Sequence, residues 1–151
     1  MSNKHYQIEV FKDVILVTLR GDWDMNTNIQ YLAFFADTLK SRRGKAFHVL
    51  VDMRTWKVPD SVSFAKMKAP IQLDRRNQLS ETWLEDGETV ADHIANKFFN
   101  EQNFTLQRTK DIESFMQQVD SMFGAKTKAH IFDWQAAHAV DKENLSDDKQ
   151  F

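Results

Sequence analysis

The strongest constraint on the fold is an almost unbroken apolar run near the middle of the chain. Residues 46–53 read Ala-Phe-His-Val-Leu-Val-Asp-Met, and a polar turn that leads to Asp60 and Ser61 follows them. An apolar run of this length, rich in β-branched residues, predicts a strand that is buried on both faces. We expect the rest of the chain to be arranged around this strand.

Two strands are predicted near the N-terminus. Residues 6–11 alternate apolar and polar side chains, whereas residues 14–19, Val-Ile-Leu-Val-Thr-Leu, are nearly all apolar. Lys12 and Asp13 leave two turn residues between them, which indicates a β-hairpin. The second strand is expected to lie well inside the sheet, because both of its faces are apolar.

A helix is predicted between this hairpin and the central strand. Asp24, Asn26 and Thr27 are all suitable N-caps, and the basic pair Arg42-Arg43 with Gly44 is typical of a helix end. The apolar positions recur at helical spacing and are expected to face the sheet: Ile29, Leu32, Phe35, Ala36 and Leu39.

The central strand leads into a second helix, predicted from Ser61 to Arg76. Phe64, Met67 and Ile71 would face the sheet, and Pro70 would kink or divide the helix. Residues 78–84 form a weaker strand pattern with many polar side chains, which we place near a sheet edge. The turn signal Asp86-Gly87 ends it.

The remaining elements alternate in the same way. A third helix is predicted from Glu88 or Thr89, followed by a short strand over residues 104–108 and a fourth helix that starts near Asp111. The apolar residues expected to face inward on the third helix are Val90, Ile94, Ala95, Phe98 and Phe99. The fourth helix has an apolar stripe, also expected to face inward, of Ile112, Phe115, Met116, Val119, Met122 and Phe123. We divide the chain into a domain over residues 1–123 and a peripheral helix with a flexible tail over residues 124–151.

The order of the predicted elements defines the fold class. A hairpin followed by alternating strands and helices predicts an α/β protein with a mixed, mostly parallel sheet, an N-terminal β-hairpin and about four helices. This order, with the passage from Val49-Leu50-Val51-Asp52 to Val58-Pro59-Asp60-Ser61, resembles the STAS family of anti-sigma-factor antagonists, especially its SpoIIAA-like group.

The resemblance assigns a role to the turn after the central strand. It implies a STAS-like fold in which Ser61 matches the serine that a partner kinase phosphorylates in regulatory members, with Asp60 beside it. Val62 and Ser63 depart from the family pattern, which continues with a hydroxyl residue and glycine. From the residues alone, Asp60 or Ser61 acts either as a helix N-cap or as a phosphorylation and interaction site, and Ser63 is either a second phosphorylation site or a first-turn residue.

A charged cluster is the second candidate site. Asp52, Arg54 and Asp60 could meet beyond the carboxyl end of the central strand, where ligands bind in open α/β sheets. Such a cluster would either support acid and base chemistry or form an ion pair that stabilises the turn, and we favour the ion pair.

Composition excludes several classes of function. The chain has 151 residues, no cysteine and a formal net charge of −2, so thiol chemistry and a general attraction to nucleic acid are not expected. Its glycines are isolated, which argues against a phosphate-binding loop, and its histidines lack metal-ligand spacing. We predict no metal, no cofactor, no membrane-spanning segment and, from the lack of an apolar signal segment, a cytoplasmic location.

The aromatic residues leave two functions open. Trp23, Trp56, Trp83 and Trp134 fall in predicted loops, edges or the tail, where they would either cover the core, which we favour, or anchor a partner. We predict a non-enzymatic regulatory domain that binds another protein, or a second copy of itself, through the turn at Asp60-Ser61. The alternative is a carrier of a small apolar or lipid-like ligand between sheet and helices.

Overall fold

The five strands form one mixed sheet whose spatial order follows the sequence. The computed structural model describes residues 5–69, 71–89, 91–98 and 102–139. The first strand is antiparallel to the second, and every later neighbour is parallel, as the sequence predicted. The strands, in both chain order and sheet order, are β1 (Tyr6–Phe11), β2 (Val14–Leu19), β3 (Phe47–Asp52), β4 (Gln78–Leu84) and β5 (Thr105–Thr109).

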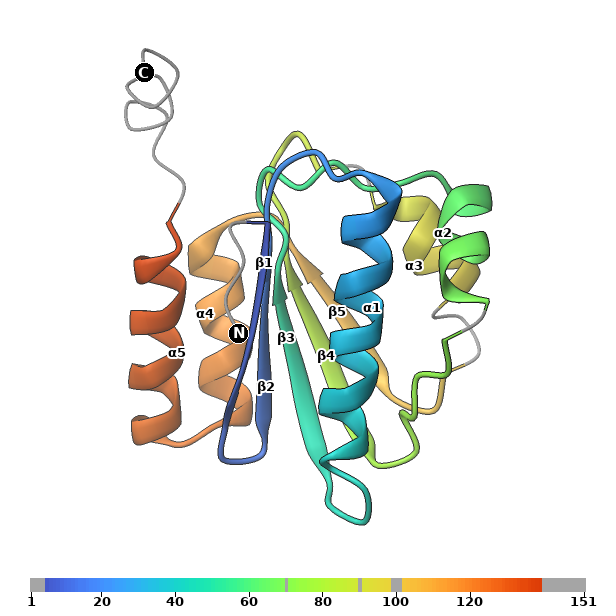
Figure 1. Ribbon diagram of the computed structural model, residues 1–151. Helices are drawn as coiled ribbons and strands as arrows, with labels where there is room; N and C mark the ends of the chain where they lie inside the picture. The colour runs from blue at the N-terminus through green and yellow to red at the C-terminus, as the bar shows by residue number, and fades with distance from the viewer. Residues whose placement is uncertain (1–4, 70, 90, 99–101, 140–151) are drawn as a thin grey trace.

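Helices cover both faces of this sheet. Figure 1 shows α1, α2 and α3 to the right of the sheet and α4 and α5 to its left. The α/β class is therefore confirmed. The bounds are α1 (Met25–Lys40), α2 (Ser61–Lys68), α3 (Asp92–Phe98), α4 (Ile112–Met122) and α5 (Ala125–Ala137).

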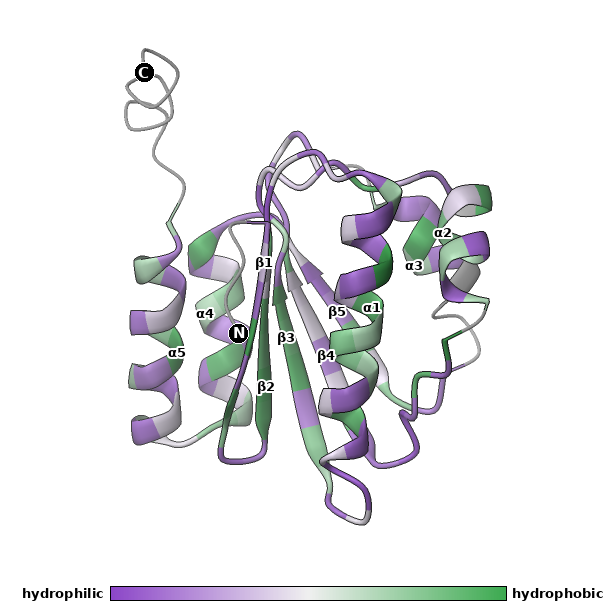
Figure 2. Cartoon of the chain, in the orientation of Figure 1, coloured by the Kyte–Doolittle hydropathy of each residue, from purple (hydrophilic) through white to green (hydrophobic). Residues whose placement is uncertain are grey.

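Each face of the sheet has its own apolar core, because side chains alternate along a strand. In Figure 2, β2 and β3 are largely hydrophobic, while the helices carry their polar residues on the outside. On the side of α1, α2 and α3, the strands bury Ile15, Val17, Leu19, Val49, Val51 and Trp83. On the other side, Val14, Leu16, Leu50 and Leu84 pack with Phe115 and Val119 of α4 and with Ile131 and Trp134 of α5.

The helix α1 starts at a predicted cap but ends earlier than expected. Asp24 is the N-cap, and its carboxylate accepts a hydrogen bond from the Thr27 amide at 2.7 Å. The C-cap is Ser41, so the basic pair and Gly44, which has a φ of +78°, lie in the following turn. The inward prediction for Ile29 was wrong. It is 38% exposed, and Asn28 is buried instead, donating from its amide to the Asp24 carbonyl at 2.9 Å.

The helix α2 is shorter than predicted. It spans eight residues and ends at Lys68, while residues 71–75 have no regular structure, so the extension to Arg76 was wrong. A proline at position 70 cannot donate the amide hydrogen bond that a continuing helix needs. Pro70 itself lies outside the described residues. Phe64 is half-buried, whereas Met67 is buried in the core.

The strand β4 lies near an edge of the sheet, as predicted, because its neighbours are β3 and the edge strand β5. Most of its polar side chains are nevertheless buried, and those of Gln78, Ser80 and Glu81 form hydrogen bonds. Glu81 accepts from the Arg75 guanidinium at 2.7 Å, the Gln78 amide at 3.0 Å and the Trp83 indole at 2.7 Å. A buried carboxylate with this many donors is compatible with an interior strand.

The third helix begins later than predicted, at Asp92 rather than at Glu88 or Thr89. The Asp86 carboxylate accepts from the amides of both of those residues, at 2.9 and 2.8 Å, and so forms a turn there. Val90 and Phe99 lie outside the described residues. The fourth helix starts after the N-cap Asp111, as predicted, and buries Phe115 and Val119, but Ile112 is 38% exposed, so its inward prediction was wrong.

A further helix, α5, follows Gly124 and takes part in the core. Ile131 is fully buried and Trp134 is 4% exposed, and both pack against β2, β3 and α4 residues. The four tryptophans are all buried, with exposures between 2% and 9%, which agrees with the packing interpretation. The predicted tail from residue 140 lies outside the described residues.

Adjacent residues of α5 provide a test of its contribution to stability. We expect Ile131→Ala to lower the free energy of unfolding by about 2–5 kcal/mol, because it opens a cavity in the core. Phe132→Ala, at a position that is 50% exposed, should change it by less than about 0.5 kcal/mol. Urea denaturation of both variants measures the difference. Equal, small effects would contradict the docking of α5 on the sheet.

Candidate functional site

The polar residues predicted to carry function lie at the carboxyl end of the parallel strands. This end faces the top of Figure 1, where the loops after β2, β3 and β4 meet the first turns of α1 and α2. Three features are found there: a buried ion cluster, a set of interlocked loops, and an exposed surface at the start of α1 and α2.

The ion cluster is centred on Asp52, the last residue of β3, which is fully buried. Its carboxylate accepts two hydrogen bonds from Arg54, at 2.9 Å from Nε and 2.6 Å from Nη2. Arg20, which follows β2, donates two more at 3.1 and 2.7 Å. One carboxylate is thus shared by two guanidinium groups, both in bidentate geometry.

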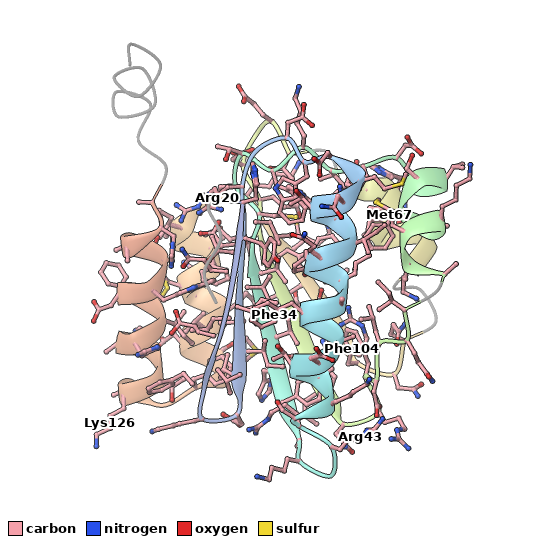
Figure 3. The ribbon with its side chains drawn as sticks, in the orientation of Figure 1. Arg20, Phe34, Arg43, Met67, Phe104 and Lys126 are labelled. Atoms are coloured by element: carbon pink, nitrogen blue, oxygen red, sulfur yellow. The ribbon has the colours of Figure 1, made fainter. Side chains whose placement is uncertain are left out.

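The same two arginines hold the end of α5. Arg20 Nη2 donates to the His138 carbonyl at 2.6 Å, and Arg54 Nη2 donates to the Gln135 carbonyl at 3.1 Å. The last carbonyls of a helix carry partial negative charge and lack partners within the helix. Asp52 neutralises only one of the two arginine charges, and the remaining positive charge interacts with the carbonyl groups at the end of α5. Figure 3 labels Arg20 at this end of the sheet.

This arrangement supports the structural interpretation of the Asp52–Arg54 pair. Both side chains are buried and fully occupied by each other, by Arg20 and by α5. Asp60 is not part of the cluster: its carboxylate accepts from the amide and hydroxyl of Ser63, at 2.8 and 3.1 Å. The structure thus brings together two of the three predicted residues and adds Arg20, which carried no sequence signal because it lies 32 positions before Asp52.

The loops next to this cluster are bonded to one another. Gly21 donates to the Thr55 carbonyl at 3.1 Å and accepts from Lys57 at 2.9 Å, which joins the loops after β2 and β3. The Thr55 amide donates to the Asp86 carboxylate at 2.8 Å, which adds the loop after β4. Thr55 has a φ of +64°, an uncommon value for a β-branched residue that these bonds hold in place.

The beginning of α2 is fixed at both sides. Asp60 is the N-cap, and its hydrogen bond from the Ser63 amide keeps the pKa of its carboxyl below the ordinary value. The ring of His93 in α3 lies 2.8 Å from the Pro59 carbonyl oxygen, to which its Nε2 donates. Asp60 is therefore an N-cap, as the structural alternative held, and Ser61 is the first residue of α2.

An exposed surface borders this helix start and was not predicted from the sequence. Met25 and Val62, in the first turns of α1 and α2, are 56% and 59% exposed. Asp22, Asp24 and Asp60 are exposed on the same end of the molecule. We call these five residues the acidic edge. A sequence signal existed only for Val62, which falls outside the apolar stripe of its helix, whereas Met25 is in helical register with the buried Leu32 and Ala36.

Other kinds of site find little support in the described part of the chain. Among those residues, no group of three histidine or acidic side chains could hold a metal ion. None of the described helices is both long and apolar enough to cross a membrane. Comparison with protein-family models found no matching family, and comparison with curated proteins found no match.

The ion cluster predicts a large loss of stability when its central charge is removed. Asp52→Asn leaves two guanidinium groups facing an amide, and we expect the free energy of unfolding to fall by about 3–5 kcal/mol. Asp120→Asn is the matched control, because Asp120 pairs with Lys128 at the surface, where both side chains are exposed and solvent screens the charge. Denaturant unfolding should show a much smaller effect for the control. Similar midpoints for the two variants would contradict the role of Asp52.

The end of α5 predicts a dependence of stability on pH. Burial, and then the charge of Arg20, hold the pKa of His138 below its ordinary value of 6.5. The unfolded chain therefore takes up a proton more readily, so stability is highest above about pH 6.5 and falls as the pH is lowered. We expect His138→Gln to reduce the loss of stability between pH 7 and pH 5, measured by thermal unfolding. Burial also lowers the pKa of His48, so His48→Gln should reduce the slope further.

Proposed function

We propose that this chain is a STAS-like, SpoIIAA-like domain that has no catalytic activity and binds another protein through the acidic edge. The observation that carries the proposal is the exposure of two large apolar side chains, Met25 and Val62, at the same end of neighbouring helices. Burying one such side chain in an interface is worth about 1.5–3 kcal/mol. Isolated exposed apolar residues are common, but these two lie beside loops that are already fixed in position.

The charge of the surface indicates the chemistry of the partner. The capping interactions of Asp24 and Asp60 keep the pKa of each carboxyl below the ordinary value, so both are ionised at neutral pH. Asp22 adds a third carboxylate, and its contact with Lys57 is long, at 3.9 Å, and exposed. A partner with basic residues around an apolar contact would complement this surface.

The same charge argues against self-association through this surface. In a two-fold symmetric dimer, the same patch of each copy faces the other. Carboxylates would then meet carboxylates, which disfavours the contact. A different protein is therefore the favoured partner, rather than a second copy of the chain.

The proposal includes regulation at Ser61. A phosphate on this residue would lie at the N-terminus of α2, where free amides and the helix dipole favour an anion. It would also add about two negative charges next to Asp60. Such a change would strengthen attraction to a basic partner or block an apolar contact at Val62, and in either case it would alter binding.

Affinity capture from a lysate of the source cells, with the purified chain as bait, tests this function. We expect Val62→Glu to lose the captured partners, because it places a charge in the apolar contact. Phe132→Glu, at a similarly exposed position on α5, should retain them. Ser61→Asp should change the set or the amounts of captured proteins relative to Ser61→Ala.

Two results would contradict the proposal. Equal loss in the Val62 and Phe132 variants would indicate nonspecific capture. Identical partners for wild type and Ser61→Asp would exclude a Ser61 switch. The interaction at Val62 would then be judged separately, from the comparison of Val62→Glu with Phe132→Glu.

A further inference from the structure

A small cavity lies within the apolar core on the side of α1, α2 and α3. Its volume is about 60 Å³, and its walls are almost entirely apolar and aromatic. Five wall residues carry polar groups: Tyr31, Trp56, Arg75, Glu81 and Trp83. The chemistry of those groups decides what the cavity can accept.

Trp56 supplies a buried donor without an acceptor. The residue is 6% exposed, and its indole Nε1 has no hydrogen-bond partner within the described residues. By contrast, the indole of Trp23 donates to the Arg20 carbonyl, and that of Trp83 donates to Glu81. An unpaired buried N–H group is costly, so its retention in the wall of a cavity calls for an explanation.

Tyr31 is the second neutral donor in the wall. It is buried, and burial followed by the nearby charge of Glu81 raises the pKa of its hydroxyl above the ordinary range. The hydroxyl therefore keeps its proton at any physiological pH. Trp56 and Tyr31 come from different elements, the loop after β3 and α1, and both border the same space.

The two charged groups of the wall neutralise each other. Arg75 Nη1 donates to a Glu81 oxygen at 2.7 Å, and Glu81 is 3% exposed. The Glu81 carboxylate also holds Gln78 and Trp83. A carboxylate ligand would meet Glu81 at short range without a free cation to balance it, so the wall favours a neutral ligand.

The size of the cavity indicates which element must move for a ligand to enter. Pockets for organic ligands usually have volumes of about 300–1,000 Å³, so a ligand with an alkyl chain needs more room than this small, partly open cavity has. The short helix α2 covers this side with Phe64, a wall residue that is only half-buried. Met67 of the same helix, labelled in Figure 3, is buried in the core on this side of the sheet. An outward shift of α2 would enlarge the cavity.

We propose that this cavity binds a neutral, largely apolar molecule with a carbonyl oxygen, which accepts a hydrogen bond from the indole N–H of Trp56. Tyr31 is the second donor available to that oxygen. The apolar part of the ligand lies between the sheet and α2. This site is separate from the acidic edge and does not depend on the proposed function.

NMR titration with 2-octanone tests the site, with octanoate as the charged comparator. The chain has four tryptophans, and loss of one indole signal in Trp56→Phe assigns the Trp56 resonance. We expect 2-octanone to shift this resonance in a saturable way and to bind more tightly than octanoate. Trp56→Phe should weaken binding about fivefold, the value for one hydrogen bond of about 1 kcal/mol. Trp134→Phe, on the opposite face of the sheet, should bind as the wild type does.

Three outcomes would overturn the proposal. The first is that none of the tryptophan indole signals of the wild-type protein responds to 2-octanone, a result that requires no variant to fold. The second is equal affinity of wild type and a folded Trp56→Phe variant, which would remove the indole from the site. The third is tighter binding of octanoate than of 2-octanone, which would exclude a neutral ligand.

Discussion

The buried carboxylate of Asp52 is the interaction on which the arrangement of this protein depends. An isolated charge in the core would be very unfavourable, and Asp52 is tolerated because Arg20 and Arg54 both bind it. The excess positive charge then holds the carbonyl end of α5. A single carboxylate thus joins the end of β2, the end of β3 and the final described helix.

Sequence patterns were sufficient to predict a strand or helix where the spacing of its apolar residues matches the residues that are buried in the structure. The strands over residues 6–11 and 14–19 have the predicted bounds, and α4 begins after its predicted cap. The central strand was recognisable because apolar residues lie on both of its faces, Val49 and Val51 on one and Leu50 on the other. In each case the pattern reports burial directly, so no knowledge of distant residues was needed.

The prediction failed where burial depends on partners that are distant in sequence or chemically unexpected. The pattern of β4 was weak because the strand is polar, but Glu81 is buried there and accepts hydrogen bonds from Arg75, Gln78 and Trp83. Likewise, the sequence predicted a cluster that contains Asp52 and Arg54 but gave no indication that Arg20 belongs to it. It also predicted Asp60 as a member of this cluster, although Asp60 is the N-cap of α2. The acidic edge also emerged only after the helices were placed, since Met25 is in register with the apolar stripe of α1 but is exposed as its first residue.

The contact between Arg20 and His138 has a consequence for folding. It joins residues 118 positions apart, so it closes almost the whole described chain into one loop. Contacts of such long sequence separation carry a large entropic cost and form slowly. Until they form, the face of the sheet that carries Val14 and Leu16 lacks the cover of Ile131 and Trp134. The docking of α5 is therefore expected to be a late step of folding, and the period before it is when the chain is most exposed to aggregation.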